Sequence, residues 1–314
     1  MSHILRLVGL SLALCVAINV SLLSRAQAQF TYTYYPTDTT INSIVDTDFA
    51  IVGYAGGSYD DNFNANFTSP SSPTIQVVTG ANILGEMDIF NTSIVDFTGG
   101  AAGAVVPTNS STLNITGGEI GFALNVDHSV INMSGGLVDD LEGQGKQINV
   151  SGGTVGTLVA NVNTDYLGNS LGSSIMNLTG GEITGETSAF NDAILNIYGG
   201  KLGSILRAAE GGTINIYGTG LTATLFNSSF GNGYSLYSLT GSLEDGNVLN
   251  NTILRVRNDG ITYGHSSFNL VNVVPEPGAY GLLLGSGLAG AGVLLRRRRN
   301  PRVTSVRSQC DSEE

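Results

Sequence analysis

Apolar and polar residues alternate in one repeated pattern through the middle of the chain. Each repeat places Asn, or Asp in the first, after an apolar residue and before another, followed by a small residue or Tyr and then by Gly–Gly or Gly–Thr. Alternation with a period of two is typical of a β-strand, and the glycines are expected to supply a turn with positive φ. The segments are DFTGG (96–100), LNITGG (113–118), INMSGG (131–136), INVSGG (148–153), MNLTGG (176–181), LNIYGG (195–200) and INIYGT (214–219).

The spacing of the repeats predicts how they stack. From Asp96 the Asn positions advance by 18, 18, 17, 28, 19 and 19 residues, and the surplus of the long step falls in the polar segment 161–173, interpreted as a loop. An apolar residue returns after the turn in each of the last six repeats, so each unit holds two strands but cannot cover its own apolar face. We therefore predict an all-β fold, a parallel and right-handed β-solenoid of about seven or more coils over residues 75–221. A β-sandwich and a left-handed hexapeptide helix fit the repeat less well.

The segments on either side of the repeats lack the motif. Residues 29–74 are richer in Tyr, Asp and Pro and are predicted to form an amino-terminal cap, whereas residues 222–274 alternate again and are predicted to be capping strands. A solenoid needs both caps because its last coil otherwise exposes an unpaired edge. On its repeat and its Gly–Gly turns, the exported part resembles repetitive surface β-solenoid proteins, including autotransporter passenger-like and haemagglutinin-like chains. The resemblance implies a surface protein and is not specific to one activity.

The first 28 residues have the organisation of a secretory signal peptide. A basic residue, Arg6, precedes an apolar run from Leu7 to Leu23, and Ala26 and Ala28 form the small-x-small site that signal peptidase cleaves. The alternative, a membrane span, is weaker because the run contains polar residues and is short for a spanning helix. We expect residues 1–28 to be removed during export.

The carboxyl-terminal end combines three elements in order. Pro275, Glu276 and Pro277 precede an apolar stretch, residues 278–295, and the arginines 296–299 follow it. The positive-inside bias predicts that Arg296, Arg297, Arg298 and Arg299 stay in the cytoplasm. This end, residues 275–314, resembles the PEP-CTERM sorting signal, although its tail of residues 300–314 is longer than is usual. The resemblance implies an exosortase as partner, transient membrane insertion through residues 278–295, cleavage near Pro275–Pro277, and delivery to the cell surface or extracellular matrix; a permanent anchor is the alternative.

Composition and charge narrow the classes of function. The chain has 43 glycines among 314 residues, three His, two Cys and no Trp, which disfavours a disulfide framework or a cysteine-built metal site. Residues 29–274 contain five Lys or Arg against 21 Asp or Glu, a net charge of −16. Such a surface repels polyanions, so we expect no nucleic-acid partner.

A carbohydrate-active β-helix enzyme, a polysaccharide lyase or hydrolase, is the alternative to a structural role. The residue types of a polygalacturonase-like site are present, but their order is wrong, and Ser266 replaces the final glycine. A calcium-dependent lyase site has one local candidate, an acidic group with Lys146. We expect no enzyme activity, cofactor or metal centre, and neither His128 nor His265 has further ligands at suitable spacing. The polygalacturonase-like set consists of Asn163, Thr164, Asp165, Asp139, Asp140, Gly264, His265, Arg255 and Arg257. The lyase candidate consists of Asp139, Asp140, Glu142 and Lys146.

The repeated Asn and two tyrosines are the candidate contact residues. Recurrence at one place in the coil predicts that Asn114, Asn132, Asn149, Asn177, Asn196 and Asn215 form a hydrogen-bonded ladder, which we favour over glycosylation of their Asn-x-Ser/Thr tripeptides. Tyr198 and Tyr217 are predicted to stack on an outer face, either as ladder packing or as a platform for sugar rings. Together these features predict an exported, structural or adhesive surface protein that contacts extracellular polysaccharide.

Overall fold

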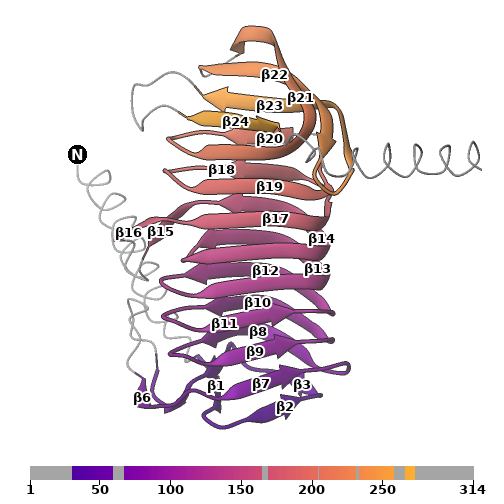
Figure 1. Ribbon diagram of the computed structural model, residues 1–314. Coiled ribbons are helices and arrows are strands. Elements are labelled where there is room, and N and C mark those ends of the chain that lie inside the picture. The colour runs from indigo at the N-terminus through magenta and orange to yellow at the C-terminus, as the bar shows by residue number, and fades with distance from the viewer. Residues whose placement is uncertain are drawn as a thin grey trace, which may run out of the picture. The chain divides into compact units, whose positions relative to one another are not determined.

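The computed structural model describes residues 30–58, 67–164, 169–203, 205–230, 233–257 and 266–272. This part of the chain consists of strands and turns, which confirms the all-β class (Figure 1). Its compact unit ends at Asn272. The strands before the repeats are β1 (Tyr32–Tyr35), β2 (Thr39–Ile41), β3 (Ile44–Val45), β4 (Phe49–Val52), β5 (Tyr54–Gly56) and β6 (Thr68–Pro70).

The repeats contribute strands that stack coil on coil. The strands are β7 (Thr74–Val77), β8 (Asn82–Ile89), β9 (Ile94–Phe97), β10 (Ala101–Pro107), β11 (Thr112–Ile115), β12 (Glu119–Val126), β13 (Val130–Gln144), β14 (Gln147–Ala160), β15 (Val162–Thr164), β16 (Ser170–Ser173), β17 (Ile175–Ile183), β18 (Glu186–Ala189), β19 (Ile194–Lys201) and β20 (Ile205–Ala208). The last strands are β21 (Thr213–Phe230), β22 (Tyr234–Leu243), β23 (Val248–Arg257) and β24 (Ser267–Asn272).

Parallel pairing joins each coil to the next at equivalent positions of the repeat. One set of strands pairs in the order β7, β9, β11, β13, β14, β17, β19, β21 and β24. The second set pairs in the order β4, β8, β10, β12, β13, β14, β18, β20 and β23. Both sets are visible as stacked arrows in Figure 1. The long strands β13 and β14 belong to both sets, so each continues around the bend as one strand, although their pairing register shifts there between Met133 and Leu137.

The core is built from columns of apolar residues that occupy equivalent positions of successive repeats. The apolar residue after each ladder position is at most 1% exposed and lies in register with its equivalent one coil away. Stacking in register buries each of these side chains against the coils above and below, and truncating one would leave a cavity worth about 2–5 kcal/mol. The column consists of Phe97, Ile115, Met133, Val150, Leu178, Ile197 and Ile216.

The two glycines of each repeat have different structural roles. The second glycine has the positive φ that the sequence predicts, as at Gly153 with φ 84°. The first glycine is required by close packing, because a Cβ at Gly152 would lie 2.5 Å from the carbonyl oxygen of Ser134 in the preceding coil. The expectation that both glycines need positive φ is therefore wrong for the first of each pair.

The flanking segments join the same stack. Strands β1, β2, β3 and β4 pair in parallel with β4, β7, β8 and β8 respectively, so parallel coils begin before the motif does. After the last repeat β21 continues into an antiparallel hairpin with β22, and β22 pairs in the same way with β23. The chain then returns to the coils, because β23 pairs in parallel with β20 and β24 with β21. The surplus of the long repeat contains the antiparallel pair β15–β16.

Candidate functional site

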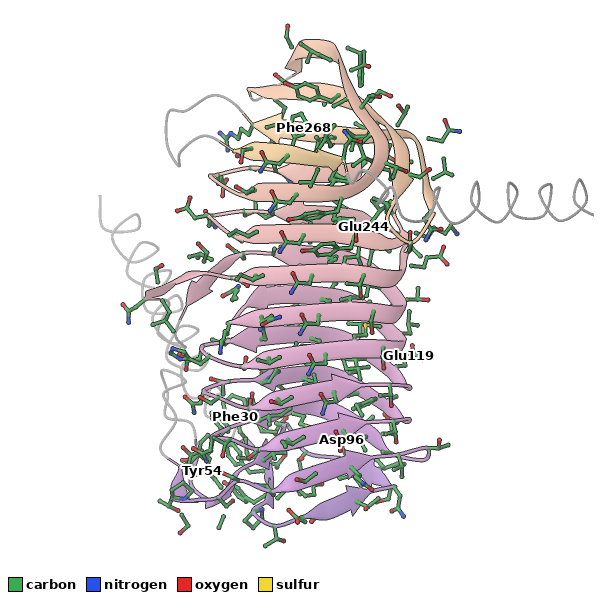
Figure 2. The ribbon with its side chains drawn as sticks, viewed as in Figure 1. Phe30, Tyr54, Asp96, Glu119, Glu244 and Phe268 are labelled. Carbon is green, nitrogen blue, oxygen red and sulfur yellow. The ribbon has the colours of Figure 1, made fainter. Side chains whose placement is uncertain are left out.

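A ladder of side-chain hydrogen bonds runs along the outer face of the first strand set. The Nδ2 of each Asn donates to a side-chain oxygen one coil earlier, at 2.7–3.0 Å, starting from Asp96 Oδ1. Asp96 lies on the face turned to the viewer in Figure 2. The structure thus brings together all six predicted Asn and adds one at the end. In order, the ladder contains Asp96, Asn114, Asn132, Asn149, Asn177, Asn196, Asn215 and Asn269.

Sequence reasoning missed the last amide of the ladder. Asn269 lies 54 residues after Asn215, far outside the 17- to 19-residue period, yet its Nδ2 donates to Asn215 Oδ1 at 2.7 Å. The local signal is present, since Phe268 and Leu270 flank it in the same apolar–Asn–apolar pattern. The hairpin of β21 and β22 accounts for the long interval, because the chain leaves the coil and later returns to it.

The ladder leaves regular unused hydrogen-bonding capacity. An Asn amide has two N–H donors and two acceptor lone pairs, and the contact with each neighbouring coil uses one donor or one acceptor. Along the half-buried amides from Asn114 to Asn196, one N–H and one lone pair per coil therefore remain beyond the ladder. At Asn149 the Nε2 of Gln147 occupies the spare acceptor at 2.7 Å. Successive coils repeat this arrangement at about 4.8 Å.

A row of exposed hydroxyl groups lies beside the ladder, two residues after each Asn. Three of these hydroxyls donate to carbonyl oxygens of the preceding coil, at 3.1–3.3 Å. A hydroxyl that donates in this way keeps its acceptor lone pairs for solvent or a ligand. The row consists of Thr98, Thr116, Ser134, Ser151 and Thr179. We call the ladder together with this row the ladder face.

Tyr198 and Tyr217 continue the hydroxyl row in the next two coils. Their rings are stacked with centroids 4.3 Å apart and planes at 15°. Both side chains are half-buried, and each ring uses one of its faces on the other. Partial burial, followed by the hydrogen bond and the charge of Tyr217 and the charge of Glu244, raises the pKa of the Tyr198 phenol. The Tyr198 phenol therefore stays neutral through the physiological range.

The structure does not gather the residues of the polygalacturonase-like set. Asp139 and Asp140 are exposed on β13, whereas Arg255 and Arg257 lie on β23. Three strands of the second set, β14, β18 and β20, separate β13 from β23. At about 4.8 Å per strand the separation is about 19 Å, too far for one catalytic group. The side chains of Asn163 and Thr164, and residues Asp165, Gly264 and His265, lie outside the described part.

The other acidic and histidine candidates have ordinary surroundings. Glu142 Oε1 accepts hydrogen bonds from Gln144 Nε2 at 2.7 Å and Asn161 Nδ2 at 3.4 Å, while Lys146 is exposed at a corner of the coil. His128 has a 62% exposed side chain in a turn, with Nδ1 4.0 Å from Asp127 Oδ1. Within the described residues no group of three His, Cys, Asp or Glu could hold a metal ion.

A cluster of arginines, which we call the arginine cluster, lies on the second strand set near the end of the stack. Arg207 Nε and Nη2 donate to the hydroxyl of Tyr234 at 3.0 and 2.7 Å, and Nη1 lies 3.5 Å from Glu186 Oε1. Its guanidinium lies 4.9 Å from the ring centroid of Phe190 and 5.3 Å from that of Tyr234. Arg255 is the register partner of Arg207 on the next strand, β23.

Arg257 and its carboxylate partner complete the arginine cluster. Arg257 follows Arg255 by two positions on β23, and its Nη1 lies 3.4 Å from Glu210 Oε1. Burial alone would lower the pKa of the Arg207 guanidinium, but Tyr234 and Glu186 stabilise the charged form and raise it above its ordinary value. The sequence analysis grouped Arg255 with Arg257 in the polygalacturonase-like set. It did not indicate that Arg207, 48 residues earlier, lies beside Arg255.

Comparison with known protein families identifies the end of the chain. Residues 273–299 match the PEP-CTERM protein-sorting motif, which confirms the resemblance predicted from Pro275–Pro277, the apolar stretch 278–295 and the arginines 296–299. The motif marks the chain as an exported protein that an exosortase processes and sorts to the cell surface. Neither the comparison with curated proteins nor the comparison with solved structures found a match.

The predicted processing sites lie outside the described residues. They are the signal-peptide residues Ala26 and Ala28, the motif residues Pro275, Glu276 and Pro277, the stretch 278–295, and Arg296, Arg297, Arg298 and Arg299. In the part of the chain that the structure describes, no helix has the length and apolar character needed to cross a membrane.

Proposed function

We propose that this chain is a structural or adhesive protein of the cell surface or extracellular matrix, built as a right-handed parallel β-solenoid that displays the ladder face to polysaccharide. The observation that carries the proposal is the unbroken hydrogen-bonded ladder from Asp96 to Asn269. The parallel registers that repeat every 17–19 residues support the solenoid, and the sorting motif supports the surface location.

The chemistry of the ladder face suits sugars. Sugar hydroxyls both donate and accept hydrogen bonds. The coils of the ladder offer a spare amide donor beside a hydroxyl and, except at Asn149, where Gln147 uses it, a spare amide acceptor. One such contact is weak because it only replaces a contact with water. Equivalent contacts repeated along one rigid face act together, however, once the first has formed. A polysaccharide chain lying along the stack would therefore be held by many weak contacts, with the Tyr198–Tyr217 pair extending the face.

The ends of the chain supply the route to the surface. The signal peptide, residues 1–28, starts export, and the apolar stretch 278–295 then halts it, with the arginines 296–299 held in the cytoplasm. Pro275 and Pro277 lack amide hydrogens and disfavour helix, so this junction stays open to the exosortase. Mass spectrometry of the surface fraction should find a chain from near Gln29 to near Pro275–Pro277. A surface chain intact through Glu314 would instead indicate a permanent anchor.

The test of the proposed role is binding without turnover. The mature chain, purified from the surface of its host, would be incubated with neutral and acidic polysaccharides, with and without Ca²⁺, and both retention and product formation would be measured. We expect retention of at least one polysaccharide and no products. Turnover at an ordinary enzymatic rate would overturn the structural role in favour of a polysaccharide lyase or hydrolase.

A matched pair of variants assigns the binding to the ladder face. Thr116→Val combined with Ser134→Ala removes two exposed hydroxyls beside the ladder. Retention should fall about fivefold or more, as expected for the loss of two contacts of at least about 0.5 kcal/mol each. Thr157→Val, on the second strand set, is the control and should leave retention unchanged. Equal losses of polysaccharide retention in the double variant and in the control would show that the ladder face does not bind the polymer.

A further inference from the structure

The second half of β21 is an open strand edge. Its parallel pairings with β19 and β24 end at Ile216 and Gly218, and beyond them β21 pairs antiparallel with β22, near the top of the stack in Figure 1. On the other side of Thr219–Phe226 no strand of the described part of the chain pairs with β21. A Cβ at Gly220 would meet nothing but its own chain neighbours within 4 Å. An edge strand of this kind is a template for a further strand.

The apolar side chains of this edge become exposed along the strand. Leu221 is 4% exposed and Ala223 packs against the core, whereas Leu225, two residues further on, is 49% exposed. Phe226 beside it is 56% exposed. Exposed apolar residues that lie together mark an interaction surface, which scattered single ones do not. A strand that pairs with this edge would cover part of both side chains.

Charge is absent from this region of an otherwise acidic chain. Residues 211–243, which include the edge, have no charged residue over 33 positions, the longest such run in residues 29–274. Residues 29–274 together carry a net charge of −16, so two copies repel each other least where they meet along the uncharged run. Monomeric proteins often protect an edge strand with Lys or Pro. Strand β21 has neither, and its pairing with β22 is regular from Thr222 to Leu225.

We infer that the open edge of β21 binds a second copy of this chain, edge to edge and in antiparallel order. A second copy offers the same uncharged edge and the same two apolar side chains, so one twofold axis satisfies both partners. The backbone hydrogen bonds of the added strand supply the attraction, and burial of Leu225 and Phe226 adds to it. The inference goes beyond the proposed function and does not depend on the binding of polysaccharide.

Pairing of this kind would also serve display. The twofold axis of an antiparallel strand pair is perpendicular to the sheet, so both copies keep equivalent faces on the same side. The two ladder faces would therefore point the same way. One polysaccharide chain that contacts both would be held more strongly than by either copy alone.

Sedimentation velocity of the mature chain, purified from the surface of its host, tests for the dimer over a wide range of concentration. We expect a reversible equilibrium between monomer and dimer. Phe226→Lys should weaken dimerisation at least about tenfold, because apolar burial is lost and a like charge from each copy enters the interface. Leu84→Lys replaces an apolar side chain of similar exposure, 55%, on β8 and should leave dimerisation unchanged. Thermal unfolding checks that both variants fold.

Hydrogen exchange identifies the strand that pairs. As the concentration rises and the dimer forms, the backbone amides of residues 219–226 should exchange more slowly. The amides of β24, the last strand of the first set, are the internal control and should not change. A chain that stays monomeric at every concentration, protection at β24 and not at β21, or equal weakening of the dimer by the two lysine variants would each overturn the inference. None of these measurements contains polysaccharide, so their failure is separate from a failure of the ladder face.

Discussion

The ladder lies on one column of the stack, and Arg207 and Arg255 of the arginine cluster lie on another. Only the first column repeats the same residue type from coil to coil. The ladder keeps an amide in every coil from Asn114 to Asn215. The other column, on the second strand set, changes from coil to coil, and we call it the variable column. In order it contains Leu124, Glu142, Val159, Ser188, Arg207 and Arg255.

The difference has a physical cause. A carboxamide is complementary to itself, since it donates on one side and accepts on the other, so each added Asn satisfies the one before it. Most other side chains are not self-complementary, and like charges in register repel one another. Repetition therefore stabilises the ladder, whereas the variable column differs from coil to coil.

Breaking the turn that both columns share should have the largest effect. Gly152→Val together with Gly153→Val should destabilise the fold by about 4 kcal/mol or more. The Cβ at position 152 would clash with the Ser134 carbonyl oxygen, and the positive φ at position 153 is strained for valine. Urea unfolding followed by circular dichroism measures the change. Asp139→Asn with Asp140→Asn, at exposed positions, is the control and should cost less than about 0.5 kcal/mol. Equal losses would contradict the registers described above.

Interrupting the ladder tests whether its members depend on one another. Asn177→Ala removes the partner of both Asn149 and Asn196 and should cost about 1–3 kcal/mol, because two half-buried groups lose a hydrogen bond. Asn269→Ala, at the exposed end, removes one bond and should cost about 0.5–1 kcal/mol. Thermal unfolding of both variants checks the order. A larger loss at position 269 would show that the ladder is not a cooperative chain.

The tyrosine pair tests the end of the hydroxyl row. Tyr217→Ala removes the stacked contact with Tyr198 and should cost about 0.5–1.5 kcal/mol of unfolding free energy. Tyr217→Phe keeps the stacked ring and serves as the control, with little change expected. Urea unfolding measures both variants. Equal losses of stability would show that the Tyr217 hydroxyl, and not the stacked ring, stabilises the pair.

The smallest expected effect concerns the turn between β22 and β23. Asp245 accepts hydrogen bonds from the backbone N–H of Gly200 at 2.5 Å and from the backbone and side chain of Asn247. Partial burial raises the pKa of this carboxyl, but these hydrogen bonds outweigh it and leave the pKa below the ordinary 3.8. A carboxyl whose pKa is lower when folded contributes stability above its unfolded pKa. That contribution is lost as the pH falls through the folded pKa.

The corresponding measurement is unfolding at neutral and acid pH. Asp245→Asn should reduce stability at pH 7 by less than about 1 kcal/mol, because the carboxylate is exposed and screened by solvent. The difference between variant and unmodified chain should shrink as the pH falls from the ordinary pKa of 3.8 through the lower pKa of the folded state. A difference that persists at acid pH would mean that the carboxylate charge does not matter to this turn.

The regular part of the fold and of the ladder face was predictable from local sequence. Period-two alternation with a recurrent Asn and Gly–Gly identifies the strands and the ladder residues, because equivalent positions of a repeat must meet when the units stack. The same logic predicted that Tyr198 and Tyr217 would meet. It failed for the first glycine of each pair. Glycine is required there because the preceding coil leaves no room for a Cβ, and not because of the residue's own φ.

What only the tertiary structure decided lies where the chain leaves its period. Asn269 joins the ladder after an interval of 54 residues, and Arg255 lies beside Arg207 after 48, because β21 and β22 leave the coils as a hairpin before β23 and β24 return to them. The sequence by itself determined the repeat, the ladder residues from Asp96 to Asn215 and the sorting motif at its end. Those features depend on spacing along the chain, whereas the arginine cluster depends on where the returning strands pair, which no local pattern encodes.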